Sequence, residues 1–260
     1  MGISFRKYHG TGNDFVMIDN RELTIRRDNT VLIKRLCDRH FGIGADGVIL
    51  LQNHPDGDFE MVYFNADGNE STMCGNGGRC IVEFANSCGI GKDKYRFLAI
   101  DGWHLAERTD DEVRLKMKDV EGVKNIDGNL FLDTGSPHYI LFTEGVDEVD
   151  VKDRGAAVRN SENFRQDGVN VNFVELQEKD LFIRTYERGV EDETLSCGTG
   201  VTASALAWAL HTKKEDGYYG VSIQTPGGRL KVEFEKQGDT FKEIWLRGPA
   251  VEVFSGQINV

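Results

Sequence analysis

The chain has 260 residues, of which 39% are hydrophobic and 28% are charged, and this composition is typical of a folded, soluble protein. It excludes a disordered tail, a collagen-like repeat and a coiled coil. The 43 acidic and 31 basic side chains give a net charge of −12, and the long-range field of that charge repels nucleic acids and anionic membranes. We therefore predict a small-molecule substrate, and no nucleic-acid or membrane partner.

Short runs of β-branched or alternating apolar residues predict many strands along the chain. These runs cover residues 48–51, 59–64, 113–117, 139–142, 169–174, 181–186, 229–234 and 244–246. Helical periodicity is confined to residues 30–40, 79–88 and 201–211. The last helix is apolar on every side but only about half as long as a bilayer-spanning helix, so we expect it to be enclosed by other elements.

The most informative feature of the sequence is an internal repeat. Tyr63 is followed by Cys-Gly-Asn-Gly at residues 74–77, and Tyr186 is followed at the same interval by Cys-Gly-Thr-Gly at residues 197–200. Each tetrapeptide opens a predicted helix, and a glycine-led strand pair follows each helix. We infer an α+β fold with two pseudo-symmetric halves, each a curved, mostly antiparallel β-sheet or barrel around a central α-helix.

The repeat also divides the chain. We place the N-terminal half, which carries Cys74, at residues 1–120 and the C-terminal half, which carries Cys197, at residues 121–249. The boundary falls in a Gly/Asp-rich stretch without a proline-rich linker. We expect the active site to lie in a cleft between the two halves.

The five cysteines are an odd number in a chain that is long enough to fold without disulfides. This usage favours a cytoplasmic location, as does an N-terminus that lacks the apolar stretch of an export signal. We interpret Cys37, Cys80 and Cys88 as small core residues.

Cys74 and Cys197 differ from the other cysteines because each directly precedes Gly-x-Gly at a helix start. Backbone N–H groups and the positive end of the helix dipole lower the pKa of a thiol at such a position and attract an anion. Two halves that face each other would place one sulfur on each side of a bound amino-acid α-carbon. This geometry predicts a two-base racemase or epimerase in which dipoles stabilise the carbanion.

Three other interpretations of the paired thiols stay open at this stage. They could form a redox-active disulfide, although the Cys-x-x-Cys spacing of dithiol exchangers is absent. They could bind zinc, although no His or Cys lies at ligand spacing around either one, and we predict no metal site. They could also be the remnant of a duplication without present chemistry.

Two glycine-rich segments, residues 10–15 and 42–47, look superficially like phosphate-binding loops. Neither has the strand-loop-helix order of a P-loop or a dinucleotide fingerprint. We interpret both as turns that present backbone groups and Asn13 to the site.

In its motifs the sequence resembles the diaminopimelate epimerase family over essentially the whole chain. The motifs that carry the resemblance are residues 9–15, 37–47, 64–68, 73–79, 135–138, 169–173, 186–189 and 193–200. The resemblance implies the diaminopimelate epimerase-like fold and cofactor-independent epimerisation of LL-2,6-diaminopimelate to meso-diaminopimelate. That reaction belongs to lysine and peptidoglycan precursor biosynthesis, and neither pyridoxal phosphate nor another cofactor is expected.

The resemblance also implies roles for particular residues. Cys74 and Cys197 would be the acid/base pair, one a thiolate and the other a thiol. The N–H groups that would hold the reacting α-carboxylate belong to Gly75, Asn76, Gly198 and Thr199. The side chains that would bind substrate amino and carboxylate groups are those of Asn13, Asn65, Asn170 and Arg188, with Arg188 suited to a bidentate clamp. The side chains that would lie near the reacting amine and tune protonation are Glu187 and His138.

Two positions depart from the family pattern, because Ser136 stands where asparagine is usual and Gly47 stands where glutamine is usual. The segment that leads to Cys197 is also one residue longer than in many members. The resemblance further implies that a strand near residues 250–260 packs back onto the N-terminal half. It also implies a homodimer, a state common in the family.

Two other functions stay open. A relative with this fold could racemise or epimerise proline, hydroxyproline or histidine by the same mechanism, or could bind amino acids without catalysis. Arg188 together with Asn65 and Asn170 favours a substrate that carries a second amino-acid head group.

Overall fold

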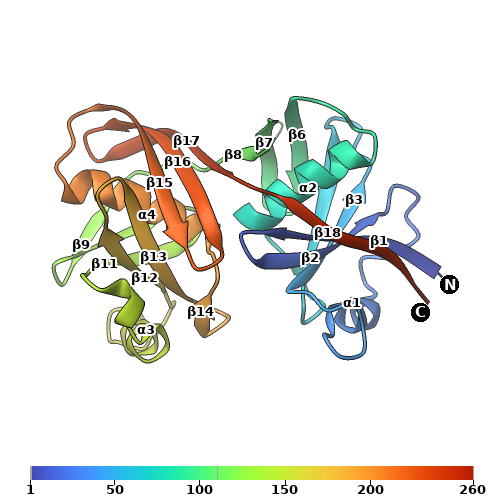
Figure 1. The fold of residues 1–260 in the computed structure, drawn as a ribbon, viewed down its shortest axis with the longest axis horizontal. Coiled ribbons are helices and arrows are strands. Elements are labelled where there is room, and N and C mark those ends of the chain that lie inside the picture. The colour runs from blue at the N-terminus through green and yellow to red at the C-terminus, as the bar shows by residue number, and fades with distance from the viewer. Residues whose placement is uncertain (1, 110, 260) are drawn as a thin grey trace. The chain divides into compact units, whose positions relative to one another are not determined.

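The computed structural model describes residues 2–109 and 111–259, so that Met1, Asp110 and Val260 lie outside the described residues. The chain divides into two units (Figure 1). The first unit extends to Leu115 and also contains the C-terminal segment from Gly248, and the second unit is Lys116–Arg247. The predicted boundaries were residues 120 and 249.

The first unit is a curved sheet with two helices. Its strands are β1 (Gly2–Gly10), β2 (Asn13–Asp19), β3 (Gly47–Gln52), β4 (Phe59–Asn65), β5 (Glu70–Ser71), β6 (Lys94–Ala99), β7 (Gly102–Arg108), β8 (Val113–Lys116) and β18 (Val251–Asn259). Hydrogen-bonded neighbours follow the order β18–β1–β2–β3–β4–β6–β7–β8, and β5 pairs with the end of β4. The pairs β2/β3 and β4/β6 are parallel, and the other pairs in this order are antiparallel.

The second unit has the same design. Its strands are β9 (Lys124–Ile126), β10 (Asn129–Asp133), β11 (Pro137–Phe142), β12 (Asn170–Leu176), β13 (Asp180–Glu187), β14 (Asp192–Thr194), β15 (Gly217–Thr225), β16 (Gly228–Gln237) and β17 (Thr240–Gly248). The order is β9–β10–β11–β12–β13–β15–β16–β17, and β14 pairs with the end of β13. The parallel pairs are β11/β12 and β13/β15.

The two units therefore match strand by strand. Their parallel pairs fall at the same places, and the hairpins β6–β7 and β15–β16 close in the same way, with Ala99 opposite Gly102 and Thr225 opposite Gly228. Helix α1 (Thr30–Cys37), between β2 and β3, corresponds to helix α3 (Val151–Arg159), between β11 and β12. The predicted α+β fold with two pseudo-symmetric halves is confirmed.

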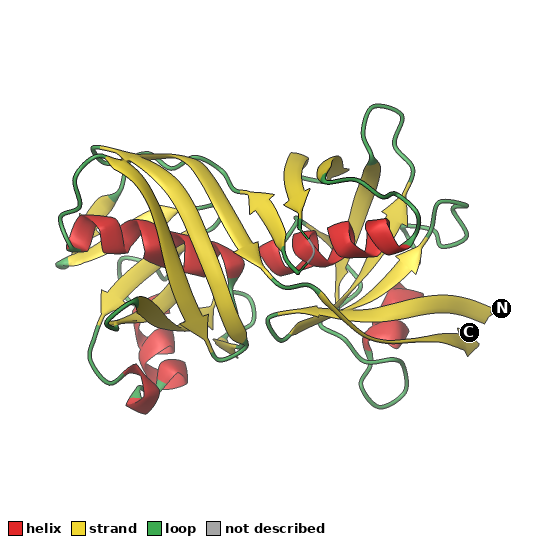
Figure 2. Cartoon of the chain, turned by 45° about the horizontal axis from the view of Figure 1, so that its top comes forward, coloured by secondary structure: helices red, strands yellow, loops and turns green. Residues whose placement is uncertain are grey.

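A central helix runs along the sheet of each unit, α2 (Gly75–Ser87) in the first and α4 (Gly198–His211) in the second (Figure 2). Helix α2 buries the face that carries Cys80, Ile81 and Phe84, and it contacts β1, β2, β3, β4 and β7. Helix α4 is buried on nearly its whole surface and contacts β10, β11, β12, β13, β15 and β16. This enclosure agrees with the prediction from its apolar sequence.

The two tyrosines that the internal repeat matches in sequence, Tyr63 and Tyr186, are not at equivalent positions of the two sheets. Ser71 and Thr194 occupy the same position relative to Cys74 and Cys197, but Ser71 pairs with Tyr63 whereas Thr194 pairs with Thr185. The equivalent of Tyr63 is therefore Thr185 and not Tyr186, because Thr185 and Thr194 are nine positions apart in sequence whereas Tyr63 and Ser71 are eight positions apart. Since side chains alternate along a strand, Tyr186 packs on the opposite face of its sheet, in the apolar cluster that includes Val151 of α3.

Three local elements differ from the prediction. Helix α1 ends at Cys37 instead of residue 40, because Asp38 turns to an extended conformation and its Oδ1 accepts hydrogen bonds from the N–H groups of His40 and Phe41 at 2.7 and 2.8 Å. Helix α3 was not predicted, because four of its nine residues are charged and it has a glycine at its middle, Gly155. A Cβ on Gly155 would lie 2.4 Å from the Cβ of Tyr186, so glycine permits the helix to approach the sheet.

The hairpin β1–β2 was not predicted either. An inward-facing lysine, Lys7, interrupts the apolar alternation of β1, and its Nζ lies 2.7 Å from Asp14 Oδ2 in a buried ion pair. Thr11 and Gly12 form the turn with φ of 48° and 89°, as a two-residue hairpin turn requires. The glycine-rich segment 10–15 thus contains a turn, as interpreted from the sequence.

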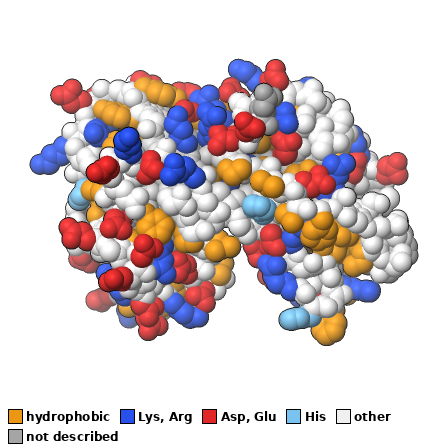
Figure 3. All heavy atoms as spheres, in the orientation of Figure 1, with side chains coloured by type: hydrophobic (Ala, Val, Ile, Leu, Met, Phe, Trp, Pro, Cys, Tyr) orange, Lys and Arg blue, Asp and Glu red, His pale blue; other side chains and the backbone are white. Residues whose placement is uncertain are grey.

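No helix within residues 2–109 and 111–259 is long and apolar enough to cross a membrane. On the face drawn in Figure 3, lysine and arginine side chains are interspersed with aspartate and glutamate side chains.

Candidate active site

Cys74 lies at the N-cap of helix α2, where the backbone is still extended (φ −99°, ψ 148°). Its Sγ accepts a hydrogen bond from the N–H of Gly77 at 3.2 Å. Gly75 and Asn76 form the first turn, and first-turn N–H groups point out of the start of a helix. The thiol and these amides therefore share the end of α2 that carries the positive dipole, where a thiolate or a carboxylate is stabilised.

Asn13, at the start of β2, is oriented by a carboxylate. Its Nδ2 donates to Asp46 Oδ2 at 2.7 Å. Its Oδ1 consequently points the other way, 3.9 Å from Cys74 Sγ and 3.3 Å from Asn76 Nδ2. The glycine-rich turn at residues 42–47 thus positions Asn13 through Asp46, a side chain that sequence analysis did not single out.

Arg79 is a fully buried cation on the first turns of α2. Its guanidinium donates to four neutral oxygens, Gly75 O at 3.1 Å, Asn76 Oδ1 at 2.9 Å, Thr11 Oγ1 at 3.3 Å and Pro249 O at 3.3 Å. Among residues 2–109 and 111–259, no carboxylate forms an ion pair with Arg79. Burial lowers the pKa of Arg79 below its usual value, and the nearby Cys80 and Cys74 act in the opposite direction. Sequence analysis assigned no role to this residue, although it lies at the start of the predicted helix 79–88 and within the motif at residues 73–79.

Asn65 ends strand β4 and is exposed. Gly47 lies opposite Asn65 in the pair β3/β4. A Cβ at Gly47 would lie 2.5 Å from Phe64 O and 2.6 Å from Tyr63 Cε2. The absence of the family's usual glutamine at position 47 therefore has a local packing reason, since the Tyr63 ring and the backbone of β4 occupy the space.

Cys197 occupies the equivalent N-cap of helix α4, also with an extended backbone (φ −114°, ψ 110°). Its Sγ lies 3.4 Å from Thr199 Oγ1. The carbonyl of Thr199 accepts a hydrogen bond from Thr134 Oγ1 at 2.8 Å, which fixes the first turn. The two helix starts share their backbone geometry, but an amide oxygen of Asn13 faces the sulfur of Cys74 and a hydroxyl faces the sulfur of Cys197.

His138 is completely buried on β11, directly behind Thr199. Its Nε2 lies 3.0 Å from both Thr199 Oγ1 and Ser136 Oγ, and its Nδ1 lies 3.0 Å from Asn172 Nδ2. Burial, assisted by the positive charge of Arg188, lowers the pKa of His138 to about 3. The imidazole is therefore neutral at physiological pH.

Asn170, at the start of β12, is buried and engaged inside the second unit. Its Oδ1 accepts a hydrogen bond from the backbone N–H of Arg188 at 2.8 Å. Its Nδ2 donates to Ser136 Oγ and Pro137 O, both at 3.1 Å. The amide donors of Asn170 are thus used within the protein, and the residue is best placed to hold Arg188.

Arg188 and Glu187 follow one another at the end of β13. Arg188 is exposed, and its NH1 donates to Asp167 O at 2.9 Å. Glu187 is half-buried, and its Oε2 accepts a hydrogen bond from Thr194 Oγ1 at 2.9 Å. Both side chains are held near the start of α4 by the strand pair β13/β14.

The structure gathers most of the predicted residues into two groups, one in each unit. The first group is Asn13, Cys74, Gly75 and Asn76. The second group is His138, Asn170, Glu187, Arg188, Cys197, Gly198 and Thr199. Within the described residues, the side chain of Asn65 makes no hydrogen bond to the first group.

The remaining cysteines lie apart from the helix starts. Cys37 and Cys80 are buried, whereas Cys88 is half-buried at the end of α2, and all five cysteines are free thiols. Burial raises the pKa of Cys37 to about 12 and also raises the pKa of Cys80 and Cys88. In the part of the chain that the structure describes, no group of three or more His, Cys, Asp or Glu side chains is arranged to hold a metal ion.

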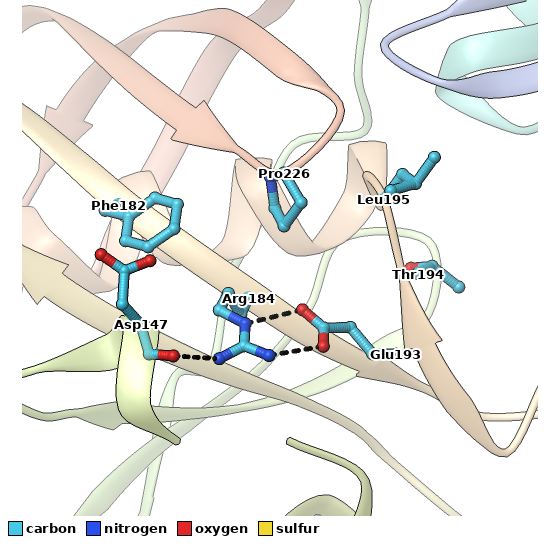
Figure 4. Close-up of a pocket in the computed structure, with 7 residues that line it drawn as sticks. All are labelled: Asp147, Phe182, Arg184, Glu193, Thr194, Leu195 and Pro226. Carbon is cyan, nitrogen blue, oxygen red and sulfur yellow. Dashed lines mark hydrogen bonds and ion pairs between the residues drawn. The ribbon is translucent and has the colours of Figure 1, made fainter. Parts of the chain in front are cut away.

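A pocket of about 480 Å³ opens in the second unit (Figure 4). Its lining residues are Asp147, Phe182, Arg184, Glu193, Thr194, Leu195 and Pro226. Arg184 forms a bidentate pair with Glu193, both bonds at 2.7 Å, and its NH1 donates to backbone carbonyls of residues 146, 147 and 149. The charge of Arg184 is therefore already neutralised within the protein, and the pocket lacks the anion-binding group that a substrate carboxylate needs.

The fold is shared with two groups of solved structures. A phenazine biosynthesis protein of the PhzF family from Bacillus anthracis matches with a TM-score of 0.82 at 14% identity, and each chain is covered completely. A probable proline racemase from Agrobacterium radiobacter matches with a TM-score of 0.70 at 16% identity, over 99% of this chain and 93% of that one. These matches define the fold class, which is that of PhzF and proline racemase structures.

Sequence comparisons define the family within that class. The profile of the family described as diaminopimelate epimerase matches residues 5–122 and 130–253. The chain is 52% identical to the diaminopimelate epimerase of Flavobacterium psychrophilum over 254 residues, which cover 97% of this chain and 98% of the relative. It is 44% identical to that of Chlorobaculum tepidum over 261 residues, which cover 96% and 99%. The chain belongs to the diaminopimelate epimerase family, whose members are isomerases.

Proposed function

We propose that this chain epimerises LL-2,6-diaminopimelate to meso-diaminopimelate, with Cys74 and Cys197 as its two acid/base groups and without a cofactor. The observation that carries the proposal is the repetition of one arrangement, in which a cysteine occupies the N-cap position of the central helix of each unit and a polar side chain faces its sulfur. Membership of the diaminopimelate epimerase family supports the choice of substrate.

In this proposal the two helix starts hold the reacting head group of the substrate. The α-carboxylate accepts hydrogen bonds from first-turn N–H groups, which belong to Gly75, Asn76, Gly198 and Thr199. The positive dipole ends of α2 and α4 supply charge that complements the carboxylate. Asn13 is oriented with Oδ1 outward from Asp46, so it offers an acceptor to the substrate ammonium group.

The proton transfer requires one sulfur on each face of the α-carbon. The thiolate takes the α-proton, and the C–H electron pair moves into the carboxylate to give an enediolate-like carbanion. The opposite thiol then donates its proton to the other face of the carbon, which inverts the centre and exchanges the roles of Cys74 and Cys197. Because general acid–base catalysis contributes only about 10²–10⁴-fold, stabilisation of the carbanion by the helix ends must supply much of the remaining acceleration.

The distal carboxylate and amine would distinguish diaminopimelate from simpler amino acids. Arg188 is exposed and one of its guanidinium nitrogens is anchored on Asp167 O, which leaves further donors for a bidentate carboxylate pair. Asn170 supports this clamp by accepting the backbone N–H of Arg188. Asn65 supplies an exposed amide, and Glu187 supplies a carboxylate that can receive an ammonium group.

The test is stereoisomer analysis of purified protein incubated with LL-diaminopimelate in the absence of pyridoxal phosphate. We expect formation of the meso isomer, and no inversion of proline, hydroxyproline or histidine. Inversion of one of these amino acids instead of diaminopimelate, or activity only after addition of pyridoxal phosphate, would contradict the proposal.

Cysteine variants test the acid/base assignment in the same assay. Cys74→Ala and Cys197→Ala should each lower turnover by about 10³-fold or more, because each removes one of the two proton-transfer groups. Cys88→Ala is the matched control, since that thiol lies at the far end of α2, and it should retain turnover. Full activity in either of the first two variants would exclude the two-base assignment.

A homodimer, which follows from the family resemblance, and a cytoplasmic location, which the cysteine usage favours, belong to the same proposal. Sedimentation velocity and cell fractionation measure these two properties independently of activity.

A further inference from the structure

A chain of buried polar side chains in the second unit has aliphatic and aromatic counterparts in the first. His138, Asn172 and Thr185 lie on β11, β12 and β13 with exposed fractions of 0%, 0% and 4%. The corresponding residues of the first unit by strand register are Phe15, Ile49 and Tyr63. The correspondence extends to the central helices, because a Cβ on Gly77 would meet Ile49 and a Cβ on Gly200 would meet Asn172.

The fold forms in the first unit without these three polar side chains. The first unit builds the same sheet around the same helix with Phe15, Ile49 and the Tyr63 ring at these places. Burying polar groups without a gain in packing is costly, and they persist where their hydrogen bonds serve a purpose. The fold by itself therefore does not require His138, Asn172 and Thr185.

The hydrogen bonds of this chain have a fixed direction. Thr185 Oγ1 donates to Asn172 Oδ1 at 3.0 Å, so the amide nitrogen of Asn172 is turned toward the histidine. Asn172 Nδ2 lies 3.0 Å from His138 Nδ1. An amide NH₂ group can only donate, so Nδ1 must be the unprotonated acceptor and the single ring proton must reside on Nε2.

The direction continues from the ring to the sulfur. His138 Nε2–H can donate to Ser136 Oγ and Thr199 Oγ1, each at 3.0 Å. Asn170 Nδ2 also lies 3.5 Å from His138 Nε2, but its two protons are directed to the closer acceptors Ser136 Oγ and Pro137 O, both at 3.1 Å. Because Ser136 Oγ accepts from Asn170, its own proton is directed to Thr199 Oγ1, 3.1 Å away. The Thr199 hydroxyl receives these bonds and is left to donate to Cys197 Sγ at 3.4 Å.

We propose that Asn172, held by Thr185, is a positioning residue for Cys197. It keeps the His138 proton on Nε2, which makes the Thr199 hydroxyl a donor to the Cys197 sulfur and favours the thiolate form of that residue. The catalytic meaning of this device rests on the proposed function, whereas the position of the proton does not. The titratable groups on the elements around His138 include Asp133 on β10, Glu175 on β12, Glu187 and Arg188 at the end of β13, and Cys197 at the start of α4.

The first experiment locates the proton in the unmodified protein. Two-bond ¹H–¹⁵N correlation spectra distinguish a protonated from an unprotonated imidazole nitrogen, and His138→Gln identifies the signal of His138. We expect a neutral ring with a proton on Nε2 and none on Nδ1. A ring that carries its proton on Nδ1 would overturn the proposal.

The second experiment replaces Asn172 by isoleucine, the residue at the equivalent position of the first unit, and Thr185 by valine, which has nearly the same shape but no hydroxyl. In the double variant Asn172→Ile/Thr185→Val, alkylation of Cys197 by iodoacetamide at pH 7 should slow about tenfold, the effect of about one pKa unit at a thiol, while alkylation of Cys74 serves as the internal reference. Ser204→Ala is the matched control, because it removes another buried hydroxyl of the second unit, one that bonds to Gly200 O.

A fall in the Cys197 to Cys74 alkylation ratio by less than about threefold, in a variant with an unchanged circular dichroism spectrum, would contradict the proposal. If the double variant does not fold, the spectra of the unmodified protein still decide the question. Neither readout depends on turnover, so an Nε2–H ring in a protein that does not convert diaminopimelate would refute the proposed function and leave the assignment of Asn172 intact.

Discussion

Replacing Arg79 by methionine should weaken the first unit and loosen the start of helix α2. The guanidinium is fully enclosed and donates four hydrogen bonds to neutral oxygens, two of which belong to Gly75 and Asn76 of the first turn. Methionine fills a similar volume but donates no hydrogen bond. The change therefore tests whether an unpaired buried cation holds the end of the helix that carries Cys74.

The magnitude follows from the contacts of Arg79. A hydrogen bond from a charged donor contributes about 1.5–3 kcal/mol, so the four bonds together are worth about 6 kcal/mol at the lower limit. Removing the cation also removes its desolvation penalty, which offsets several kcal/mol of that loss. We expect the free energy of unfolding to fall by about 3 kcal/mol, which is a large effect for one substitution.

The assay is urea unfolding combined with hydrogen–deuterium exchange resolved to peptides of residues 75–88. Arg79→Lys should lie between the two proteins, because it retains the charge but offers fewer and differently arranged donors. Arg26→Met is the control, since Arg26 is 80% exposed in an ion pair with Asp28, and it should leave the exchange of α2 unchanged. A loss in Arg79→Met below about 1 kcal/mol, or faster exchange confined to the second unit, would refute the reasoning.

Two further predictions concern Gly47 and His138. Gly47→Ala should lower the free energy of unfolding by about 1–3 kcal/mol, because its Cβ would meet Phe64 O and Tyr63 Cε2. Gly91→Ala is the control and should leave stability unchanged, because the nearest neighbour of its Cβ lies 3.8 Å away. Equal thermal stability of the two variants would contradict this prediction. His138 has a folded-state pKa of about 3, below the ordinary value of 6.5, so its unfolded state binds a proton more readily and stability is lost as the pH falls from 6.5 toward 3. Relative to His138→Gln, the unmodified protein should lose about 1.4 kcal/mol of its free energy of unfolding for each pH unit in that range. Parallel curves of unfolding free energy against pH for the two proteins would show the prediction to be wrong.

The architecture could be predicted because the repeated Cys-Gly-x-Gly motif is local in the sequence. Each copy joins a strand to the start of a helix, so two copies indicate two similar units. The matching of Tyr63 with Tyr186 was nevertheless wrong by one residue. The hairpin from Thr185 to Thr194 is one residue longer than the hairpin from Tyr63 to Ser71, so two residues at the same distance from their cysteines are not equivalent in the strand pairs. Spacing alone does not reveal which of two turns is longer.

Other features depended on contacts between distant segments. Lys7 hides the strand pattern of β1, since a lysine at an inward position is tolerated only with Asp14 beside it. The polar chain through Asn172 joins side chains from three strands and one helix, and no local pattern predicts which way its hydrogen bonds run. Asp46 was visible only as part of a turn, and its role became clear from its bond to Asn13.

In the proposed mechanism Cys74 and Cys197 act on opposite faces of one α-carbon. The most direct test of this mechanism is incubation of LL-diaminopimelate with the enzyme in D₂O, stopped while little substrate has reacted, followed by mass analysis of each separated isomer. The two-base mechanism predicts one deuterium at the inverted carbon of the meso product and none in the recovered LL substrate, because the proton is removed by one thiolate and replaced by the solvent-equilibrated thiol of the other residue. A meso product that retains its original α-proton, or deuterium that enters the recovered substrate as fast as the product, would contradict it.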